Sequence, residues 1–273
     1  MSKVAFTGAV LAVALACSTA HAGKQRRDYF LDPPQSGLWA HADALTLGAQ
    51  ASLESRTPIE DDTFGTLSLR GSALASIGYA EAAAHMDVRY FLFTFGTTFG
   101  YRNVWRTYED PTGAAMTAAR RREIDSETGY SVRGWGYGEA RGRVVIPLDW
   151  LWFVSNHALR WEDSPKNAFD WFHTNVHDGG FMYRGDAVLF ARSAKLGAIG
   201  PYVRIMDLPK NDERRFELAA GLIYGIRPGL KSKDDVLSVF ILTRPGDNEF
   251  GFHVLRLPVW AMVVYRASFR LLE

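Results

Sequence analysis

The chain has 273 residues, of which 47% are hydrophobic, 13% aromatic and 22% charged. Its 31 Lys and Arg residues and 30 Asp and Glu residues leave a formal net charge of +1, so no strong basic field exists to attract nucleic acid. We therefore expect no nucleic-acid partner. After the N-terminal region no stretch remains apolar for the roughly 18 residues that indicate a transmembrane helix, so that class is excluded.

Residues 1–22 have the three parts of a secretory signal peptide. Lys3 supplies the positive charge, Val4 to Ala16 form a short apolar core, and Ala20-His21-Ala22 provides small residues for cleavage. We expect cleavage after Ala22, which leaves an exported chain without cysteine. Cys17 is the single cysteine, and cleavage before it with lipidation of its thiol stays open as an alternative.

Residues 23–37 are polar and contain a Pro-Pro pair, so we interpret them as a periplasmic lead-in. From residue 38 onward apolar and polar side chains alternate, which is the period of a β-strand. Several alternating segments exceed the roughly 5–6 residues of an ordinary globular strand. The pattern predicts ten strands, at 38–54, 63–81, 87–105, 130–146, 150–162, 179–193, 202–208, 215–227, 236–244 and 250–272.

Two irregularities leave a count of twelve strands open. In the first segment the apolar positions change from even to odd numbers near Ala44, which indicates either a β-bulge or two separate strands. Pro258 interrupts the last segment, and a proline there indicates an edge, a bulge or a break. Splitting the chain at both points gives twelve strands.

The connections between the ten predicted strands alternate between the two ends of the barrel. If the N-terminus is periplasmic, the outer connections are 55–62, 107–128, 163–178, 209–214 and 245–249. The inner connections are then 82–86, 147–149, 194–201 and 228–235. Both long connections fall outside and the tightest turn falls inside, which is typical of transmembrane β-barrels.

Charged side chains recur on the polar faces of the predicted strands. Turned toward lipid, an arginine at mid-bilayer would cost ~2–4 kcal/mol, so a transmembrane barrel must direct these groups inward. We predict that the following residues face the lumen: Arg70, Arg102, Arg133, Glu139, Arg141, Arg143, Arg184, Asp186 and Arg192. The competing interpretation is a soluble β-sandwich or lipocalin-like barrel with an apolar interior. Strand length favours the membrane barrel, because spanning strands need about 9–11 residues.

The signal peptide, long alternating strands, aromatic strand ends and loop asymmetry resemble the bacterial outer-membrane β-barrels as a class, over residues 38–273. The resemblance implies an all-β fold, a single antiparallel transmembrane β-barrel in the cell outer membrane that contacts lipid and lipopolysaccharide. One feature departs from the class. Such barrels commonly end on an aromatic residue that the assembly machinery recognises, whereas Phe269 lies four places before the end of this chain.

The segment Phe153-Val154-Ser155-Asn156 resembles the His-x-Ser-Asn element of outer-membrane lipid hydrolases. In those enzymes the serine is the nucleophile and the histidine removes its proton. Here Phe153 replaces the histidine, although His157 shares a strand face with Ser155. We interpret Ser155 and His157 as a hydrogen-bonded pair in the lumen, with a hydrolase as a distant alternative.

Two predicted outer loops carry candidate binding residues. His173 and His177 are four residues apart, a spacing that can hold a metal on a helical loop, but no third ligand is defined and we expect no metal. Arg120, Arg121 and Arg122 could bind an anionic sugar or a lipopolysaccharide phosphate through bidentate hydrogen bonds. A solvated face with local ion pairs is the alternative for this arginine run.

These observations favour a non-enzymatic protein without a cofactor. A barrel of about ten strands is largely filled by its own side chains, so we do not expect a wide porin. We expect a scaffold or anchor subunit that binds other envelope proteins in motility or surface-polysaccharide machinery. A narrow outer-membrane pore is the alternative, and an outer-membrane lipid hydrolase is the most distant one.

Overall fold

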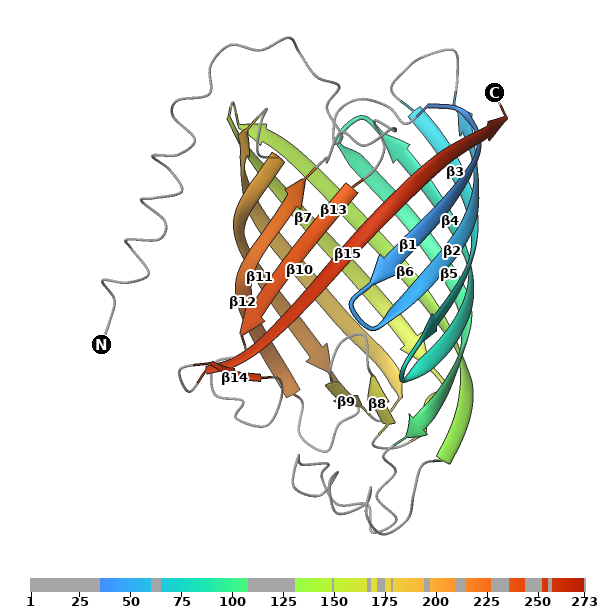
Figure 1. Cartoon of the computed structure of the whole chain (residues 1–273), viewed down its shortest axis with the longest axis vertical. Helices are drawn as coiled ribbons and strands as arrows, with labels where there is room; N and C mark the ends of the chain where they lie inside the picture. Colours follow the sequence, from blue (N-terminus) through green and yellow to red (C-terminus); the bar gives the residue numbers. More distant parts are fainter. Residues whose placement is uncertain are drawn as a thin grey trace, which may run out of the picture.

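The protein is a closed barrel of antiparallel β-strands (Figure 1). No helix among the described residues is long and apolar enough to cross a membrane. The computed structural model describes residues 35–59, 65–107, 131–148, 150–165, 168–170, 175–177, 179–193, 197–209, 215–226, 236–243, 252–254 and 257–272.

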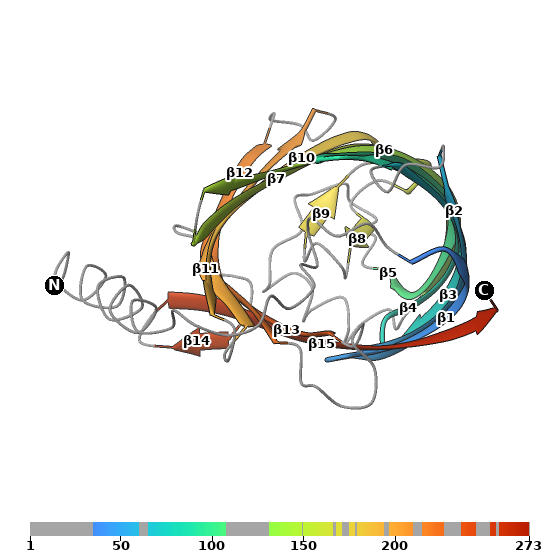
Figure 2. The same ribbon diagram turned by 90° about the horizontal axis from the view of Figure 1, so that it is seen from above.

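Twelve strands form the ring, and β1 pairs with β15 to close it (Figure 2). In ring order they are β1 (Gly37–Leu45), β2 (Gly48–Pro58), β3 (Gly65–Ser76), β4 (Tyr79–Tyr90), β5 (Phe93–Thr107), β6 (Ser131–Leu148), β7 (Leu151–Glu162), β10 (Gly180–Ser193), β11 (Gly197–Leu208), β12 (Arg215–Ile226), β13 (Val236–Thr243) and β15 (Leu257–Leu272). Three short strands of the described residues are not members of the ring: β8 (Ala168–Asp170), β9 (Asn175–His177) and β14 (Phe252–Val254). Seen from above, β8 and β9 fall inside the outline of the ring (Figure 2).

The alternative count of twelve strands is the observed one, and the count of ten is wrong. The first extra strand arises because β1 and β2 are separate, close to the irregularity at Ala44. The second arises because the predicted strands 63–81 and 87–105 are three strands, β3, β4 and β5. A two-residue turn at Ile77 and Gly78 reverses the chain, so the predicted connection 82–86 lies inside β4.

The predicted strand 250–272 is two strands, because β14 ends at Val254 and pairs back onto β15, which begins at Leu257. Pro258 lies just after this break and leaves β15 itself intact. It is the second residue of β15, and the pairing of β15 with β13 begins one residue later, at Val259 opposite Thr243. The missing N–H of the proline therefore removes no hydrogen bond to β13. At the other side of β15, pairing with β1 ends at Val264, and the Thr46 hydroxyl accepts from the Val263 amide at 2.6 Å just beyond it.

Because the ring has an even number of antiparallel strands, β1 starts and β15 ends at the same end of the barrel (Figure 1). We call this end the terminal end. The strand ends that lead into connections 107–128 and 163–178 lie at the opposite end. The expected outer position of connection 55–62 is wrong, because the extra β1–β2 hairpin moves it to the terminal end. The short turns at 46–47 and 77–78 share the opposite end with the long connections, so the length asymmetry is weaker than predicted.

Alternate side chains of the strands meet two different environments. On β5, Phe95 and Phe99 point outward and are 62% and 69% exposed, whereas Thr98 and Arg102 point inward and are each 3% exposed. The apolar face is thus outside and the charged face inside. The soluble alternative with an apolar interior does not fit this arrangement, because its faces would be exchanged.

Two glycines on the inner face of β5 make room for side chains of neighbouring strands. A Cβ at Gly100 would lie 2.5 Å from the ring of Tyr137, which crosses that position. A Cβ at Gly96 would collide with the carboxylate of Asp87, which binds Arg141 there. Glycine is therefore required at both places for the inner face to pack as it does.

Candidate functional site

A series of ion pairs lines the inner faces of β4 to β7. Arg102 donates from Nε and Nη2 to Oε2 of Glu81 at 2.9 and 2.7 Å, and its Nη1 lies 3.8 Å from Oε1 of Glu162. Arg160 Nε lies 2.5 Å from the same Glu162 oxygen, and Trp135 Nε1 donates to Oε2 at 3.1 Å. Glu162 is only 1% exposed. A carboxylate is tolerated at such a depth because cations and a donor surround it.

The series continues across β6 toward β4. Arg160 Nη1 lies 3.8 Å from Oε2 of Glu139, and Arg141 Nη1 lies 4.0 Å from the other oxygen of that carboxylate. Arg141 Nη2 donates to both oxygens of Asp87 at 2.8 and 2.7 Å. Four adjacent strands are therefore joined by charged side chains as well as by backbone hydrogen bonds.

A second charged group lies on β10 and β11. The Arg204 Nε and the Tyr202 hydroxyl donate to Oδ1 of Asp186 at 2.7 and 2.5 Å. Arg184 Nε lies 3.2 Å from Oδ2 of the same carboxylate. Asp186 is buried. Its charge is tolerated there because two guanidinium groups balance it.

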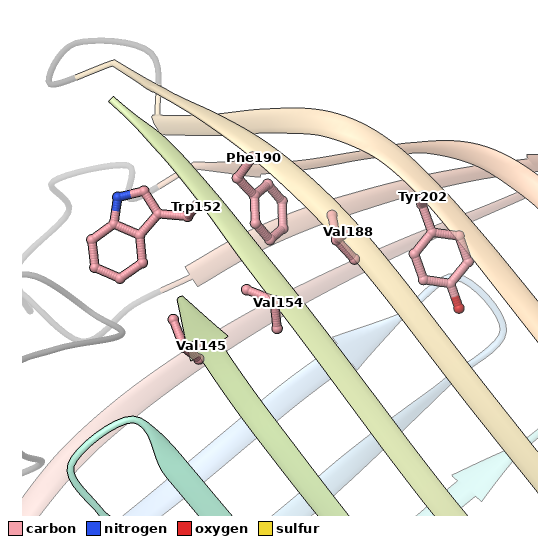
Figure 3. Close-up of a cluster of buried hydrophobic side chains, with 6 residues drawn as sticks. All are labelled: Val145, Trp152, Val154, Val188, Phe190 and Tyr202. Carbon is pink, nitrogen blue, oxygen red and sulfur yellow. The ribbon is translucent and has the colours of Figure 1, made fainter. Parts of the chain in front are cut away.

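The inner face also carries an apolar cluster near the terminal end of β6, β7, β10 and β11 (Figure 3). Its members are Val145, Trp152, Val154, Val188, Phe190 and Tyr202. Trp152 is 2% exposed, although it points into the barrel interior. The inner face thus carries apolar side chains at this end and ion-paired groups further along the strands.

The structure places most of the predicted charged residues on the inner face. These are Arg70, Arg102, Arg133, Glu139, Arg141, Arg143, Arg184 and Asp186. Arg192 belongs to β10, but its side chain lies outside the described part of the chain. Arg120, Arg121 and Arg122 in one predicted loop and His173 in another also lie outside the described residues, so binding by these two loops stays a prediction.

The second histidine of the predicted pair, His177, does not lie on a helix. His177 ends the extended strand β9, which pairs with β8. Among the described residues no group of three His, Cys, Asp or Glu side chains could hold a metal ion.

The predicted position of Ser155 and His157 in the lumen is wrong. Both point outward from β7, where Ser155 Oγ lies 3.0 Å from His157 Nε2, and His157 Nδ1 lies 2.7 Å from the Tyr183 hydroxyl. The strand is apolar on its inner face at Trp152 and Val154, which obscures its orientation in the sequence.

A polar cluster that the sequence did not reveal lies where β1 meets β15 and β2. His41 Nδ1 lies 2.9 Å from Ser268 Oγ, and His41 Nε2 lies 2.9 Å from Oε2 of Glu54. Arg56 Nη2 donates to the same Glu54 oxygen at 3.0 Å. His41 and Ser268 are 227 positions apart and meet only because the first and last strands pair. No local motif could have shown this, since ring closure alone brings them together.

A closed ring of twelve antiparallel strands, with apolar side chains outside and charged side chains inside, is the architecture of the bacterial outer-membrane β-barrels. The protein has the fold of this class.

No protein-family model and no curated protein sequence matches the chain. Among solved structures it is similar to LpxR from Salmonella typhimurium, with 8% identity, 86% of this chain and 100% of that chain covered, and a TM-score of 0.40. It is similar to the translocator domain of autotransporter NalP from Neisseria meningitidis, with 10% identity, coverage of 98% and 96%, and a TM-score of 0.39. The β domain of the Bordetella autotransporter BrkA gives 12% identity, coverage of 86% and 100%, and a TM-score of 0.45. At such identities and TM-scores, none of these proteins' activities transfers to this chain.

Proposed function

We propose that the protein is embedded in the bacterial outer membrane as a scaffold or anchor subunit of an envelope assembly. The observation that supports this role is the burial of inward-pointing side chains at both ends of the barrel. Inward-pointing Glu162, Trp152 and Met206 are between 1% and 2% exposed, at widely separated positions along the wall. Inward side chains packed in this way narrow the lumen, which suits an anchor better than a wide channel.

The lateral ion pairs also support an anchoring role. They connect adjacent strands, as Arg102 with Glu81 and Arg160 with Glu139 do, or strands one apart, as Arg141 with Asp87 does, so the barrel wall resists distortion when a partner pulls on its loops. Anchoring needs no chemical step and no cofactor. We propose that the partners are envelope proteins of motility or surface-polysaccharide machinery, bound through connections 107–128 and 163–178, and that lipid and lipopolysaccharide surround the wall.

Mild solubilisation of the outer membrane, followed by purification through a C-terminal tag, tests the scaffold role. We expect a stable complex with at least one other envelope protein, identified by mass spectrometry. A matched purification of a tagged, unrelated barrel from the same cells controls for fortuitous capture. Recovery of the protein as a lone monomer would contradict the proposal.

A narrow pore is the second candidate, favoured by the arginine surplus of the inner face. Arginines outnumber carboxylates among the described inward-facing residues, and Arg70 forms no hydrogen bond or ion pair with any of them. An open lumen of this kind would favour small anions. Planar-bilayer recording separates the two candidates: the scaffold predicts no conductance steps, and a pore predicts discrete anion-selective steps.

A further inference from the structure

We propose that Ser268, His41 and Glu54 form an acyl-transfer site on the lumen wall, which hydrolyses a small carboxylic ester that carries an anionic group. The site lies where β15, β1 and β2 meet. The inference goes beyond the scaffold role and does not depend on it.

The three side chains are connected in the order of nucleophile, base and carboxylate. Ser268 Oγ lies 2.9 Å from His41 Nδ1, and His41 Nε2 lies 2.9 Å from Glu54 Oε2. When Nε2–H donates to the carboxylate, Nδ1 is left free of a proton and can accept one from the serine hydroxyl. Arg56 donates to the same Glu54 oxygen at 3.0 Å, which fixes the carboxylate in place.

The carboxylate distinguishes this cluster from two similar ones. Two other Ser–His hydrogen bonds occur among the described residues, and in both the second ring nitrogen meets a hydroxyl: Ser72–His85–Thr98 and Ser155–His157–Tyr183. A hydroxyl stabilises an imidazolium less than a carboxylate does, because it carries no full negative charge. Among the three Ser–His clusters of the described residues, the one at His41 therefore has the groups that activate a serine nucleophile.

A buried hydroxyl without a hydrogen-bond partner among the described residues, that of Ser52, lies beside these three side chains. Ser52 is directly opposite His41 in the register of β1 and β2, it is 6% exposed, and its Oγ has no hydrogen-bond partner among the described residues. A buried hydroxyl without a partner is unfavourable, so it marks a position where a bound group accepts its hydrogen. Ser52 and Ser268 lie on opposite sides of His41 in the strand register, so Ser52 donates to a polar atom of the substrate that lies across the imidazole.

Arg70 indicates the charge of the substrate. It is directly opposite Glu54 in the register of β2 and β3, and no described residue forms a hydrogen bond or ion pair with it. Its charged neighbours are the arginines Arg266 and Arg141 and, with opposite sign, the carboxylates of Glu54 and Asp87, which bind other arginines. An anionic group on the substrate would relieve this repulsion, so Arg70 selects anionic esters.

The reaction balances with water as the second reactant. Ser268 Oγ bonds to the acyl carbon while its proton moves to His41 Nδ1. The bond from that carbon to the alcohol oxygen then breaks, and the alcohol leaves with the proton from Nδ1. Water next attacks the acyl-serine, giving its proton to Nδ1; the serine oxygen leaves and recovers that proton. The net change converts an ester and water into a carboxylic acid and an alcohol.

The test uses the full-length barrel in detergent with two probes, the p-nitrophenyl monoester of succinate and the neutral p-nitrophenyl butyrate. We expect release of p-nitrophenolate above the buffer rate, faster for the succinate ester. Ser268→Ala should reduce the enzymatic rate more than about 100-fold, and the matched control Ser155→Ala should leave it unchanged. Equal rates for the wild-type protein and Ser268→Ala would overturn the proposal.

Two positioning residues are tested with separate readouts. Glu54→Gln should lower kcat strongly, and Glu54→Asp should restore part of it, because only the aspartate keeps the charge. Arg70→Met should raise KM for the succinate ester and leave KM for the butyrate ester unchanged. Equal loss with both esters would contradict the role of Arg70.

Labelling with a fluorophosphonate keeps the proposal testable if a variant fails to fold. Mass spectrometry of the wild-type protein should find the phosphonyl group on Ser268. Labelling at Ser155, or none at any serine, would overturn it.

Discussion

The guanidinium of Arg266 on β15 donates from Nε and Nη2 to the two carboxylate oxygens of Asp43 on β1, at 2.7 Å each. The two residues are 223 positions apart and lie opposite each other in the strand register. This bidentate pair joins the first and last strands from inside the barrel. Asp43 is 4% exposed, so water competes little for its carboxylate.

Replacement of Asp43 by asparagine should weaken this seam. The variant loses a charge-assisted hydrogen-bond pair, which contributes about 1.5–3 kcal/mol. We expect the folded band on unheated gels to convert to the unfolded position at a lower temperature. Asp163→Asn, at an exposed carboxylate just beyond β7, is the matched control. An unchanged conversion temperature for Asp43→Asn would show that backbone pairing alone holds the seam.

Gly100→Ala should destabilise the barrel through the inner face. Its Cβ would lie 2.5 Å from the Tyr137 ring, which must move out of its packed position, at a cost of about 1–3 kcal/mol. Gly71→Ala is the control, because a Cβ there meets nothing within 4 Å. Equal conversion temperatures for the two variants in the heated-gel assay would contradict the packing described for Tyr137.

Glu162→Gln should destabilise the barrel more than Asp43→Asn or Gly100→Ala does. The carboxylate lies between Arg102 and Arg160, and its neutralisation leaves two buried cations with less compensation. Removing one member of a buried ion pair costs about 3–5 kcal/mol. The double variant Glu162→Gln/Arg160→Met should recover part of this loss of unfolding free energy. A double variant that loses the sum of both single effects would indicate that the groups do not interact.

The arginine run outside the described residues gives a separate prediction. Replacing Arg120, Arg121 and Arg122 by glutamine should weaken binding of lipopolysaccharide to the detergent-solubilised barrel about tenfold at low salt, with less effect at high salt. Surface plasmon resonance with immobilised lipopolysaccharide measures this. Unchanged binding would mean that the run is a solvated face.

The outward and inward faces were predictable where alternation is strong, as at Phe95, Phe99 and Arg102. The turn at Ile77 was not, because Tyr79 continues the apolar pattern in the sequence. In the structure the two-residue turn inverts the faces, so Tyr79 points inward and is 6% exposed. The compositional signal of this turn is Gly78, and a lone glycine also occurs inside strands.

The cluster at His41 could not be predicted from the sequence because it depends on contacts between residues far apart in the chain. The Ser268–His41 contact depends on ring closure, which no local pattern encodes. On β7 both faces are apolar over Trp152 and Phe153, so the side occupied by Ser155 was ambiguous and the lumen was the wrong choice.

A membrane-embedded barrel of this kind places its apolar face in lipid and its charged face in the interior. Ala73 and Ser72 are adjacent on β3 and point to opposite faces, outward and inward. Spin labels on single cysteines at these positions, in outer-membrane vesicles, report collision with oxygen in lipid and with a water-soluble nickel complex. The structure predicts that label 73 is accessible to oxygen and shielded from nickel, whereas label 72 is shielded from lipid-borne oxygen. The reverse pattern, or free access of nickel to label 73, would contradict the membrane-embedded barrel.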